Sequence, residues 1–323
     1  MHYDLVCQTL VIAILLDALV GDPRRVYAHI PHPVVIIGHV VSWLDQRFNQ
    51  PLARSRYSTF GFGAFACAVT ICIAVSGAIL IHLLAQQFSY GWIAEGIVAS
   101  TLLAGRSLYD HVLAVAKALA IGLEPAREQI SHIVGRDPDS LDEAAIARAA
   151  IESGAENFVD GFVAPVFWFA VFGMPGLVGY KAINTLDSMI AHRNERYEYF
   201  GKASAWIDDI ANWIPARLGA MMLALSAGFV RGGAPLRAWS GAIRDAPKHR
   251  SMNAGWPEAA MANALGFALA GPRQYAGVLV QDAWMGTGRT SLNASDVRMS
   301  LRLYAAAWIC VTLVLSALSY AIH

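Results

Sequence analysis

The chain has 323 residues, of which 56% are hydrophobic and 15% are charged, and its 24 Lys and Arg side chains balance its 24 Asp and Glu side chains. Soluble domains carry about 25% charged residues, so this composition argues against a soluble globule and against a disordered chain. Zero net charge also argues against electrostatic binding of nucleic acid, and we expect no nucleic-acid partner. The composition favours a membrane protein, in contact with lipid, that keeps a sizeable polar part.

Six apolar stretches could enter the membrane, where a spanning helix needs about 20 mainly apolar residues. Residues 61–85 and 303–322 meet this requirement without any Asp, Glu, Lys or Arg. The other four stretches are apolar but carry charged side chains: residues 5–20, 92–105, 158–180 and 205–230. Gly173 and Pro175 interrupt the stretch at residues 158–180.

The fold class follows from these stretches. No run of residues predicts a strand, so we predict an all-α, polytopic helical membrane protein with about four full crossings. Residues 158–180 and 205–230 are expected to be broken or re-entrant, because interrupted helices are tolerated at membrane depth where they line a protein cavity.

Lys and Arg counts in the loops indicate the orientation of the chain. Residues 86–91 contain neither and should lie outside, whereas residues 21–60 and 231–302 are rich in Arg and should be cytoplasmic. Residues 106–157 should form a helical insert on the cytoplasmic side. We expect one membrane domain over residues 1–323, whose first apolar stretch is retained because it lacks a basic start and a cleavage site.

Local signals predict two helices outside the spans. Ser140 and Glu143 have the spacing of a capping box, which starts a helix running to about Asn157. Residues 33–48 carry apolar side chains at helical spacing. That helix either lies along the cytoplasmic membrane surface or belongs to the core of a cytoplasmic subdomain.

Glu152, Glu156 and Asp160 are spaced to share one face of a helix, with Asn157 beside them. Like charges in this arrangement repel, and a divalent cation or a bound cationic group would reverse the sign of that interaction. The alternative is a solvated acidic face on which Arg148 pairs with Glu152. The position of these groups at the start of an apolar segment favours a function.

Two further polar clusters lie at the edges of apolar stretches. The first contains Lys181, Asn184 and Asp187, and the second contains Asp208, Asp209 and Asn212. Carboxylates and amides at this depth suit a hydrated Mg²⁺, which binds through one or two carboxylates and substrate phosphates. Lys181 and Arg217 could hold phosphate oxygens. The alternative is buried polar contact between helices.

A basic loop precedes a helix that begins near Glu258. The free N–H groups at a helix start bind anions, and Lys248 adds positive charge, so phosphate or carboxylate binding is expected here. The sequence contains neither a Walker-type phosphate loop nor the G-x-G-x-x-G pattern. A nucleotide, if used, is therefore not held by a standard phosphate loop.

Together these clusters resemble the CobD/CbiB family of adenosylcobinamide-phosphate (cobinamide) synthases, from about Leu16 to Gly288. The resemblance rests on motifs in this order: Leu16-Asp17, Gly21-Asp22-Pro23, His32-Pro33-Val34, Gly105-Arg106-Ser107-Leu108, Ile133-Val134-Gly135-Arg136-Asp137, Glu156-Asn157, Tyr180-Lys181-Ala182-Ile183-Asn184, Asp208-Asp209-Ile210-Ala211-Asn212, Pro215-Ala216-Arg217 and Asn253-Ala254-Gly255-Trp256-Pro257. The chain departs from the family at Met252, at Asn263 and at residues 191–192, where the family has a proline, a small residue and a glycine-containing turn.

The resemblance implies a carbon–nitrogen ligase of the cell inner membrane with its active site on the cytoplasmic side. It would join the propionate carboxylate of adenosylcobyric acid to 1-amino-2-propanol or its O-phosphate, giving adenosylcobinamide or its phosphate. Amide formation in water is uphill, so Mg²⁺ and ATP are expected, with the corrinoid as substrate rather than cofactor. Other enzymes of cobalamin biosynthesis are expected partners.

Site roles are carried over from the resemblance. The candidate catalytic residues are Glu152, Glu156, Asp187 and Asp209. The candidate metal ligands are Glu156, Asp160, Asp187, Asp208 and Asp209. The candidate substrate-binding residues are Arg136, Asn157, Lys181, Asn184, Asn212, Arg217, Lys248 and Asn253. Trp206, Trp213 and Trp256 would cover the apolar face of the corrin ring or anchor the chain at the membrane surface. We expect the acidic and amide groups to gather in one pocket at the inner face of the bilayer.

Two other functions fit parts of the sequence. The two acidic clusters suit an intramembrane Mg²⁺-dependent prenyl or lipid-phosphate transferase, but the chain shows no matching repeat. Ionisable residues and a Pro/Gly break within apolar segments suit a transporter. The long polar segments 106–157 and 231–302 argue against a transporter.

Overall fold

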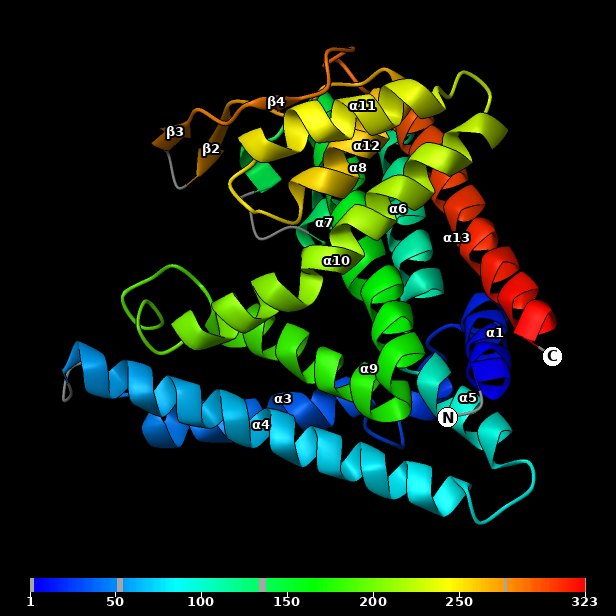
Figure 1. The fold of residues 1–323 in the computed structure, drawn as a ribbon. Coiled ribbons are helices and arrows are strands. Elements are labelled where there is room, and N and C mark those ends of the chain that lie inside the picture. Colours follow the sequence, from blue (N-terminus) through cyan, green and yellow to red (C-terminus); the bar gives the residue numbers. More distant parts are fainter. Residues whose placement is uncertain (1–2, 51–54, 134–137, 276–277, 323) are drawn as a thin grey trace. The chain divides into compact units, whose positions relative to one another are not determined.

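The computed structural model describes residues 3–50, 55–133, 138–275 and 278–322, which are mainly helical (Figure 1). The chain forms two compact units. The first contains Met1–Ala104, Ala164–Asn212 and Leu315–His323, and the second contains Gly105–Val163 and Trp213–Val314. Residues 106–157 and 231–302, which the sequence sets apart as polar segments, both fall in the second unit.

The first unit is built from long helices. Its elements are α1 (Tyr3–Val20), α2 (Arg24–Tyr27), α3 (Pro33–Phe48), α4 (Arg56–Ala85), α5 (Gly91–Ser100), α9 (Ala164–Ile190) and the first part of α10 (Lys202–Ser226). Helices α3 and α4 lie side by side, and α9 packs against both (Figure 1). Val41 and Leu44 of α3 are buried in this core beside Leu186 of α9. The helix predicted over residues 33–48 is confirmed, and its buried face makes it part of a core.

The predicted interruption of residues 158–180 is confirmed. Gly173 has φ 65° and ψ −151°, a conformation that residues with a Cβ rarely adopt, and it breaks α9 two residues before Pro175. Helix α10 contains Pro215, whose missing N–H leaves the Ala211 carbonyl without its usual helical donor. The indole Nε1 of Trp168 donates to that carbonyl at 3.1 Å and joins α9 to α10.

The second unit combines helices with short extended segments. Its elements are α6 (Gly105–Leu119), α7 (Leu123–Ser131), η1 (Pro138–Ser140), α8 (Glu143–Phe158), η2 (Val159–Val163), η3 (Ala227–Phe229), α11 (Pro235–Asp245), η4 (Ala246–Lys248), α12 (Gly255–Leu265), β1 (Leu269–Ala270), β2 (Arg273–Tyr275), β3 (Val278–Val280), β4 (Trp284–Met285) and most of α13 (Ala294–Ile322). The two antiparallel pairs, β1–β4 and β2–β3, were not predicted. Strands of two or three residues are too short to leave a period-two pattern in the sequence.

The helix predicted to start at the capping box is α8, which runs from Glu143 to Phe158. Its N-cap is Asp142 rather than Ser140, and the Asp142 carboxylate accepts a hydrogen bond from the Ala145 N–H at 2.7 Å. Asp and Ser are about equally good N-caps, so spacing alone did not separate them.

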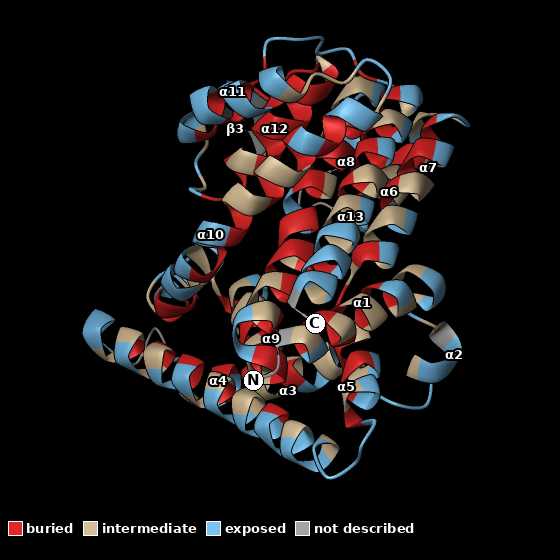
Figure 2. Cartoon of the chain, turned by 45° about the vertical axis from the view of Figure 1, so that its right-hand side comes forward, coloured by how far each residue is buried: buried red, intermediate tan, exposed pale blue. Residues whose placement is uncertain are grey.

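Three helical segments among the described residues are long and apolar enough to cross a membrane: Arg56–Ala85, Glu143–Ile190 and Ala294–Ala321. On α4, Ile73, Leu80 and Leu84 are more than half exposed, as expected of side chains that face lipid (Figure 2). Helix α5 has 10 residues, about 15 Å of helix, and is too short to span a bilayer alone. These features indicate a membrane protein.

Candidate functional site

In the first unit, the two predicted polar clusters lie on α9 and α10. Lys181 is buried on α9, and its Nζ donates to the Asn184 side-chain oxygen at 3.4 Å. Asp187 lies further along the same helix, and its carboxylate interacts electrostatically with that of Asp209 on α10. The structure therefore brings together one acidic residue from each cluster.

A hydrogen-bonded chain also joins α9 to α10. The Tyr180 hydroxyl donates to the side-chain oxygen of Asn212 at 3.0 Å, and the Asn212 amide nitrogen donates to Asp208 at 3.1 Å. Asn212 is only 2% exposed. It therefore acts in this structure as a buried link between helices, which is the alternative that the sequence left open.

The loop after α9 brings positive charge to the paired carboxylates. His192 interacts electrostatically with Asp187, and Arg193 does so with Asp209. Burial raises the pKa of Asp209 above its usual range, and Arg193 lowers it in part. A carboxylate with a raised pKa is a stronger base than one with an ordinary pKa.

Asp45, which sequence reasoning missed, anchors that loop to α3. Its buried carboxylate accepts from Arg196 at 2.6 Å and from the Tyr197 hydroxyl at 3.2 Å. An acidic residue in the last turn of an otherwise apolar helix was the available signal. Residues 191–192 lack the glycine that the family has in this turn. Neither of them has a positive φ, because Ala270 is the one non-glycine residue with positive φ among those described, so the turn needs no glycine.

In the second unit, the predicted acidic face is divided. Glu152 is buried and Glu156 is exposed on α8, whereas Asp160 is half-buried in the π-helical turn η2. A π-helical turn adds a residue and rotates the residues after it, so the simple spacing from Glu156 to Asp160 no longer applies. The side-chain amide of Asn157 donates to the Ser153 carbonyl at 2.9 Å.

Glu152 holds a strained segment of the chain. Its carboxylate accepts a hydrogen bond from the backbone N–H of Ala270 at 2.8 Å, and Ala270 has φ 58°. Positive φ is costly for alanine and persists only where the surroundings fix it. Arg148, the expected partner of Glu152 on a solvated face, instead donates to the Thr290 carbonyl at 2.6 Å and lies over the Trp284 ring.

Arg217 lies between two indole rings. Its guanidinium carbon is 4.3 Å from the Trp213 ring centroid and 4.8 Å from that of Trp256. Its Nη1 donates to the Trp213 carbonyl at 2.7 Å and to the Asn253 side-chain oxygen at 3.2 Å. Burial lowers the pKa of Arg217, and no carboxylate among the described residues opposes that shift. Trp213 and Trp256, which the sequence suggested as covers for the apolar face of the corrin ring, thus hold Arg217 between them.

The Arg217 geometry leaves part of the guanidinium available. Both of its hydrogen bonds come from Nη1, and no described residue accepts from Nε or Nη2. A half-buried cation without an acidic partner favours an anionic ligand. The planar edge formed by Nε and Nη2 matches a carboxylate or phosphate with two parallel hydrogen bonds.

Asn253 is held by a loop that ends in α12. The N–H groups of Asn253 and Ala254 donate to the Ser251 hydroxyl at 3.2 and 3.1 Å, and the Ser251 N–H donates to His249 at 3.0 Å. His249 in turn lies 3.7 Å from the buried Glu258 carboxylate. The Ser251 hydroxyl therefore accepts hydrogen bonds from two N–H groups just before α12 and fixes the loop that carries Asn253.

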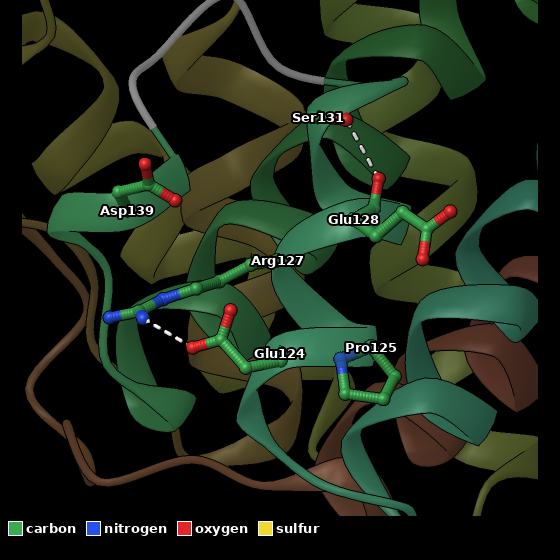
Figure 3. Close-up of a pocket in the computed structure, with 6 residues that line it drawn as sticks. All are labelled: Glu124, Pro125, Arg127, Glu128, Ser131 and Asp139. Atoms are coloured by element: carbon green, nitrogen blue, oxygen red, sulfur yellow. Dashed lines mark hydrogen bonds and ion pairs between the residues drawn. The ribbon is translucent and has the colours of Figure 1, made fainter.

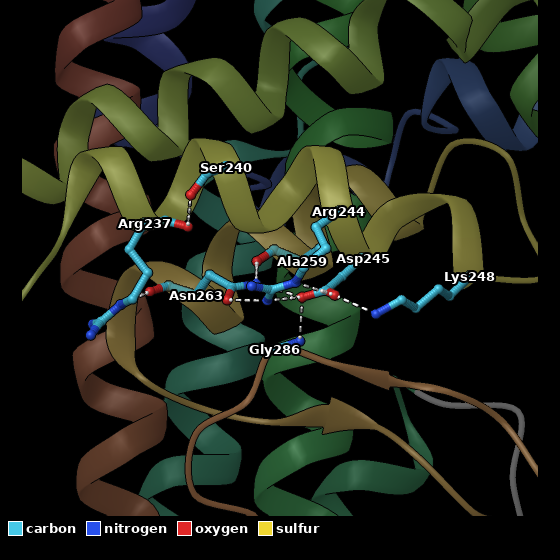
Figure 4. Close-up of polar contacts among 8 residues, drawn as sticks. All are labelled: Arg237, Ser240, Arg244, Asp245, Lys248, Ala259, Asn263 and Gly286. Atoms are coloured by element: carbon cyan, nitrogen blue, oxygen red, sulfur yellow. Dashed lines mark hydrogen bonds and ion pairs between the residues drawn. The ribbon is translucent and has the colours of Figure 1, made fainter.

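Lys248 belongs to a buried network centred on Asp245, which the sequence did not single out (Figure 4). The Asp245 carboxylate accepts from Arg244 at 2.9 and 2.6 Å, from Lys248 at 2.7 Å, and from the Asn263 amide and the Gly286 N–H at 3.1 Å each. Burial alone would raise the pKa of Asp245, but these donors hold it well below its usual range.

The same network explains the departure at Asn263. This side chain also accepts from Arg244 at 3.1 Å and donates to the Ala259 carbonyl at 2.9 Å. A Cβ on Gly241 would lie 2.2 Å from the Asn263 side chain, so glycine at 241 makes room for the amide. No clear reason for Met252, whose side chain is exposed, is seen in the structure.

A pocket of about 470 Å³ in the second unit is lined by none of the predicted site residues (Figure 3). Glu124, Glu128 and Asp139 line it, and Arg127 pairs with Glu124 at 2.7 Å. Its acidic lining would repel a phosphate or carboxylate. Arg136, the remaining predicted substrate-binding residue, lies outside the described residues.

The donor set can be tested against Mg²⁺. Within the described part of the chain, no three His, Cys, Asp or Glu side chains converge to hold a metal ion. Mg²⁺ does not need such a set, because it keeps water and binds through one or two carboxylates together with substrate phosphates. The paired carboxylates of Asp187 and Asp209 fit this requirement.

Comparison with known proteins gives one consistent result. A model of the CobD/Cbib protein family matches residues 10–304. The protein from Brucella suis biovar 1 named "Cobalamin biosynthesis protein CobD" is 47% identical over 297 residues, which cover 91% of this chain and 90% of that protein. Proteins of the same name from Rhodobacter capsulatus and Rhizobium meliloti are 46% and 45% identical, and each comparison covers 95% of both chains. No solved structure matches the chain.

Proposed function

Since this chain belongs to the CobD/CbiB family and so takes part in cobalamin biosynthesis, we propose that it forms an amide bond on the corrinoid. The carboxylate donor is the propionate of adenosylcobyric acid. The amine acceptor is 1-amino-2-propanol or its O-phosphate. The product is adenosylcobinamide or its phosphate.

The observation that supports this reaction best is the guanidinium of Arg217, which has no carboxylate partner among the described residues. Both substrates offer groups that such a cation binds, namely a carboxylate on the corrinoid and, in the phosphorylated form, a phosphate on the amino alcohol. The indoles on either side fix the guanidinium plane, so little side-chain entropy is lost when an anion binds. We assign Arg217 to an anionic group of the corrinoid or of the amino alcohol, with Asn253 orienting the guanidinium.

The first unit would supply acid–base and metal-binding groups. Asp209, with its raised pKa, would accept the proton that the amine loses as its nitrogen attacks the carbonyl carbon of the activated carboxylate and the C–O bond to the leaving phosphate breaks. Asp187, together with phosphate groups of the substrates, would hold a Mg²⁺ ion, whose charge would offset the repulsion between the two carboxylates. ATP and Mg²⁺, when bound, would supply the free energy that activates the carboxylate.

The remaining predicted residues keep narrower roles in this proposal. Lys181 and Asn184 would contact phosphate or amide groups of the substrates from α9, and Glu156 is an exposed carboxylate that could receive a proton. Lys248 would act mainly through Asp245. We place the enzyme in the cell inner membrane with its reaction on the cytoplasmic side, in line with the distribution of Lys and Arg.

A deletion strain tests the proposed place of this reaction. The corrinoid pool of the strain is measured by mass spectrometry, with and without the chain restored on a plasmid. The proposal predicts that adenosylcobyric acid accumulates and that restoring the chain removes it. Accumulated cobinamide, or an unchanged pool, would contradict the proposal.

A further inference from the structure

The first unit contains a pocket of about 620 Å³ that the proposed reaction does not use. Residues of α1, α4, α5 and α9 line it, and Gly173 and Pro175 at the break in α9 form part of its wall. Its volume lies within the range of about 300–1,000 Å³ that is usual for small-molecule sites. About 18 Å of α9 separates Pro175 from Asp187 at the α-helical rise, so the pocket is distinct from the paired carboxylates.

The pocket holds one buried carboxylate. Glu95 of α5 is only 8% exposed, and its carboxylate pairs with Nδ1 of His82. The other ring nitrogen of His82, Nε2, lies 2.8 Å from the side-chain amide nitrogen of Gln86.

The contact with His82 holds the Glu95 carboxylate in a fixed place between α4 and α5. Among the described residues that line the pocket, none is Lys or Arg, and Glu95 is the acidic one.

Aromatic rings make up much of the remaining wall: Phe88, Trp92, Phe169 and Phe172. The faces of such rings attract cations, and a buried carboxylate beside them strengthens that attraction. We propose that this pocket binds an organic ammonium ion, either a free alkylamine or the ammonium headgroup of a phospholipid.

The break in α9 contributes to the same site. Pro175 has no N–H, and Gly173 departs from helical geometry, so carbonyl groups in this turn lose their usual helical donors. Carbonyl oxygens accept hydrogen bonds from an ammonium group. We expect the ligand to be recognised by the carboxylate and the aromatic rings, with carbonyl oxygens of this turn as further acceptors.

Binding is tested on the purified full-length chain in detergent, by calorimetric titration with ethanolamine and with tetramethylammonium. Acetate and ethylene glycol serve as anionic and neutral controls. We expect saturable binding of ethanolamine at least, and none of the controls. Glu95→Gln, which keeps an acceptor for His82 but removes the charge, should weaken binding by about tenfold or more. Glu128→Gln, at an exposed carboxylate of the second unit, should leave it unchanged.

Native mass spectrometry after extraction from membranes that contain phosphatidylethanolamine distinguishes the two sources. Phosphatidylethanolamine retained by the wild type and lost in Glu95→Gln identifies a lipid headgroup, whereas binding of free ethanolamine without retained lipid identifies a free amine. If Glu95→Gln does not yield folded protein by gel filtration, Phe172→Leu replaces it, since that ring is mostly exposed and should weaken binding several-fold. The absence of both ethanolamine binding and retained lipid, or binding unchanged in the folded variant, would overturn the proposal.

Discussion

The carboxylate of Asp187 on α9 interacts electrostatically with the carboxylate of Asp209 on α10. Two like charges brought together cost free energy unless a cation offsets them. His192 and Arg193 supply part of that compensation from the loop between the two helices. A pair maintained in this way is a good candidate for metal or proton chemistry.

Removing either charge of this pair should impair the reaction. We expect Asp187→Asn and Asp209→Asn each to lower the rate of amide formation by about 100-fold or more, in line with the loss of a group that acts on the reacting atoms. The initial rate is measured by mass spectrometry of the corrinoid product. Asp110→Asn, at an exposed partner of Arg106, is the control and should keep the wild-type rate. Wild-type rates in both test variants would remove these residues from the site.

Arg217→Lys should keep the charge but lose the planar edge and the stacking between indoles. We expect kcat/KM for the corrinoid to fall by about 10- to 100-fold, because lysine cannot reproduce two parallel hydrogen bonds to a carboxylate. Steady-state kinetics at fixed amine concentration measure the change. Arg106→Lys, at an exposed ion pair, should have no effect. An unchanged kcat/KM in Arg217→Lys would show that Arg217 does not bind the corrinoid.

Asp245→Asn should destabilise the second unit. The variant leaves Arg244 and Lys248 without their buried counter-charge, and loss of one partner of a buried ion pair costs about 3–5 kcal/mol. Since both cations are about half exposed, we expect a value at or below the lower end. Thermal unfolding in detergent, followed by tryptophan fluorescence, should show a lower Tm. A Tm equal to that of the wild type would contradict the role given to Asp245.

The same residue predicts a pH dependence. Its pKa is lower in the folded chain than in the unfolded chain, so its contribution to stability is complete above the unfolded value of about 4 and is lost as pH falls below it. The difference in Tm between wild type and Asp245→Asn should therefore stay constant from pH 7 to pH 5 and shrink below about pH 4. A Tm difference that grows on acidification would contradict a lowered pKa of Asp245 in the folded chain.

Two variants of Glu152 distinguish a structural role of this residue from a catalytic one. Glu152→Gln keeps an oxygen that can accept from the Ala270 N–H, so it should preserve Tm, whereas Glu152→Ala should lower stability by about 1–3 kcal/mol by leaving that buried donor unsatisfied. Both variants are compared by thermal unfolding and by rate. Full activity in Glu152→Gln would assign Glu152 to the positioning of Ala270 and would remove it from the catalytic residues.

Local sequence signals predicted much of the helical structure. The apolar periodicity of residues 33–48 marked α3, and the Gly173–Pro175 sequence marked the break in α9. The capping-box spacing of Ser140 and Glu143 marked the start of α8 within three residues. Each of these features depends on side chains or backbone limits that act within a few residues.

The features that sequence reasoning missed depend on contacts between distant segments. Asp245 lies in a basic stretch of the sequence, which suggests an exposed acidic side chain. In the structure, hydrogen bonds from Asn263 and Gly286 place it at the centre of a buried network. From the sequence, Trp213 and Trp256 were predicted to cover the corrin ring or to anchor the chain at the membrane surface, whereas in the structure Arg217 lies between them. The π-helical turn at Val159–Val163 likewise leaves no mark in the pattern of Glu156 and Asp160.

The most direct measurement uses the purified chain in detergent with adenosylcobyric acid, Mg²⁺, ATP and either 1-amino-2-propanol or its O-phosphate. Liquid chromatography with mass spectrometry records the corrinoid and nucleotide pools over time. The account predicts an amide product, formed with one of the two amines, with one ATP consumed per product and no product when the amine is omitted. Intact adenosylcobyric acid with both amines, in a preparation that is folded and monodisperse, would contradict it.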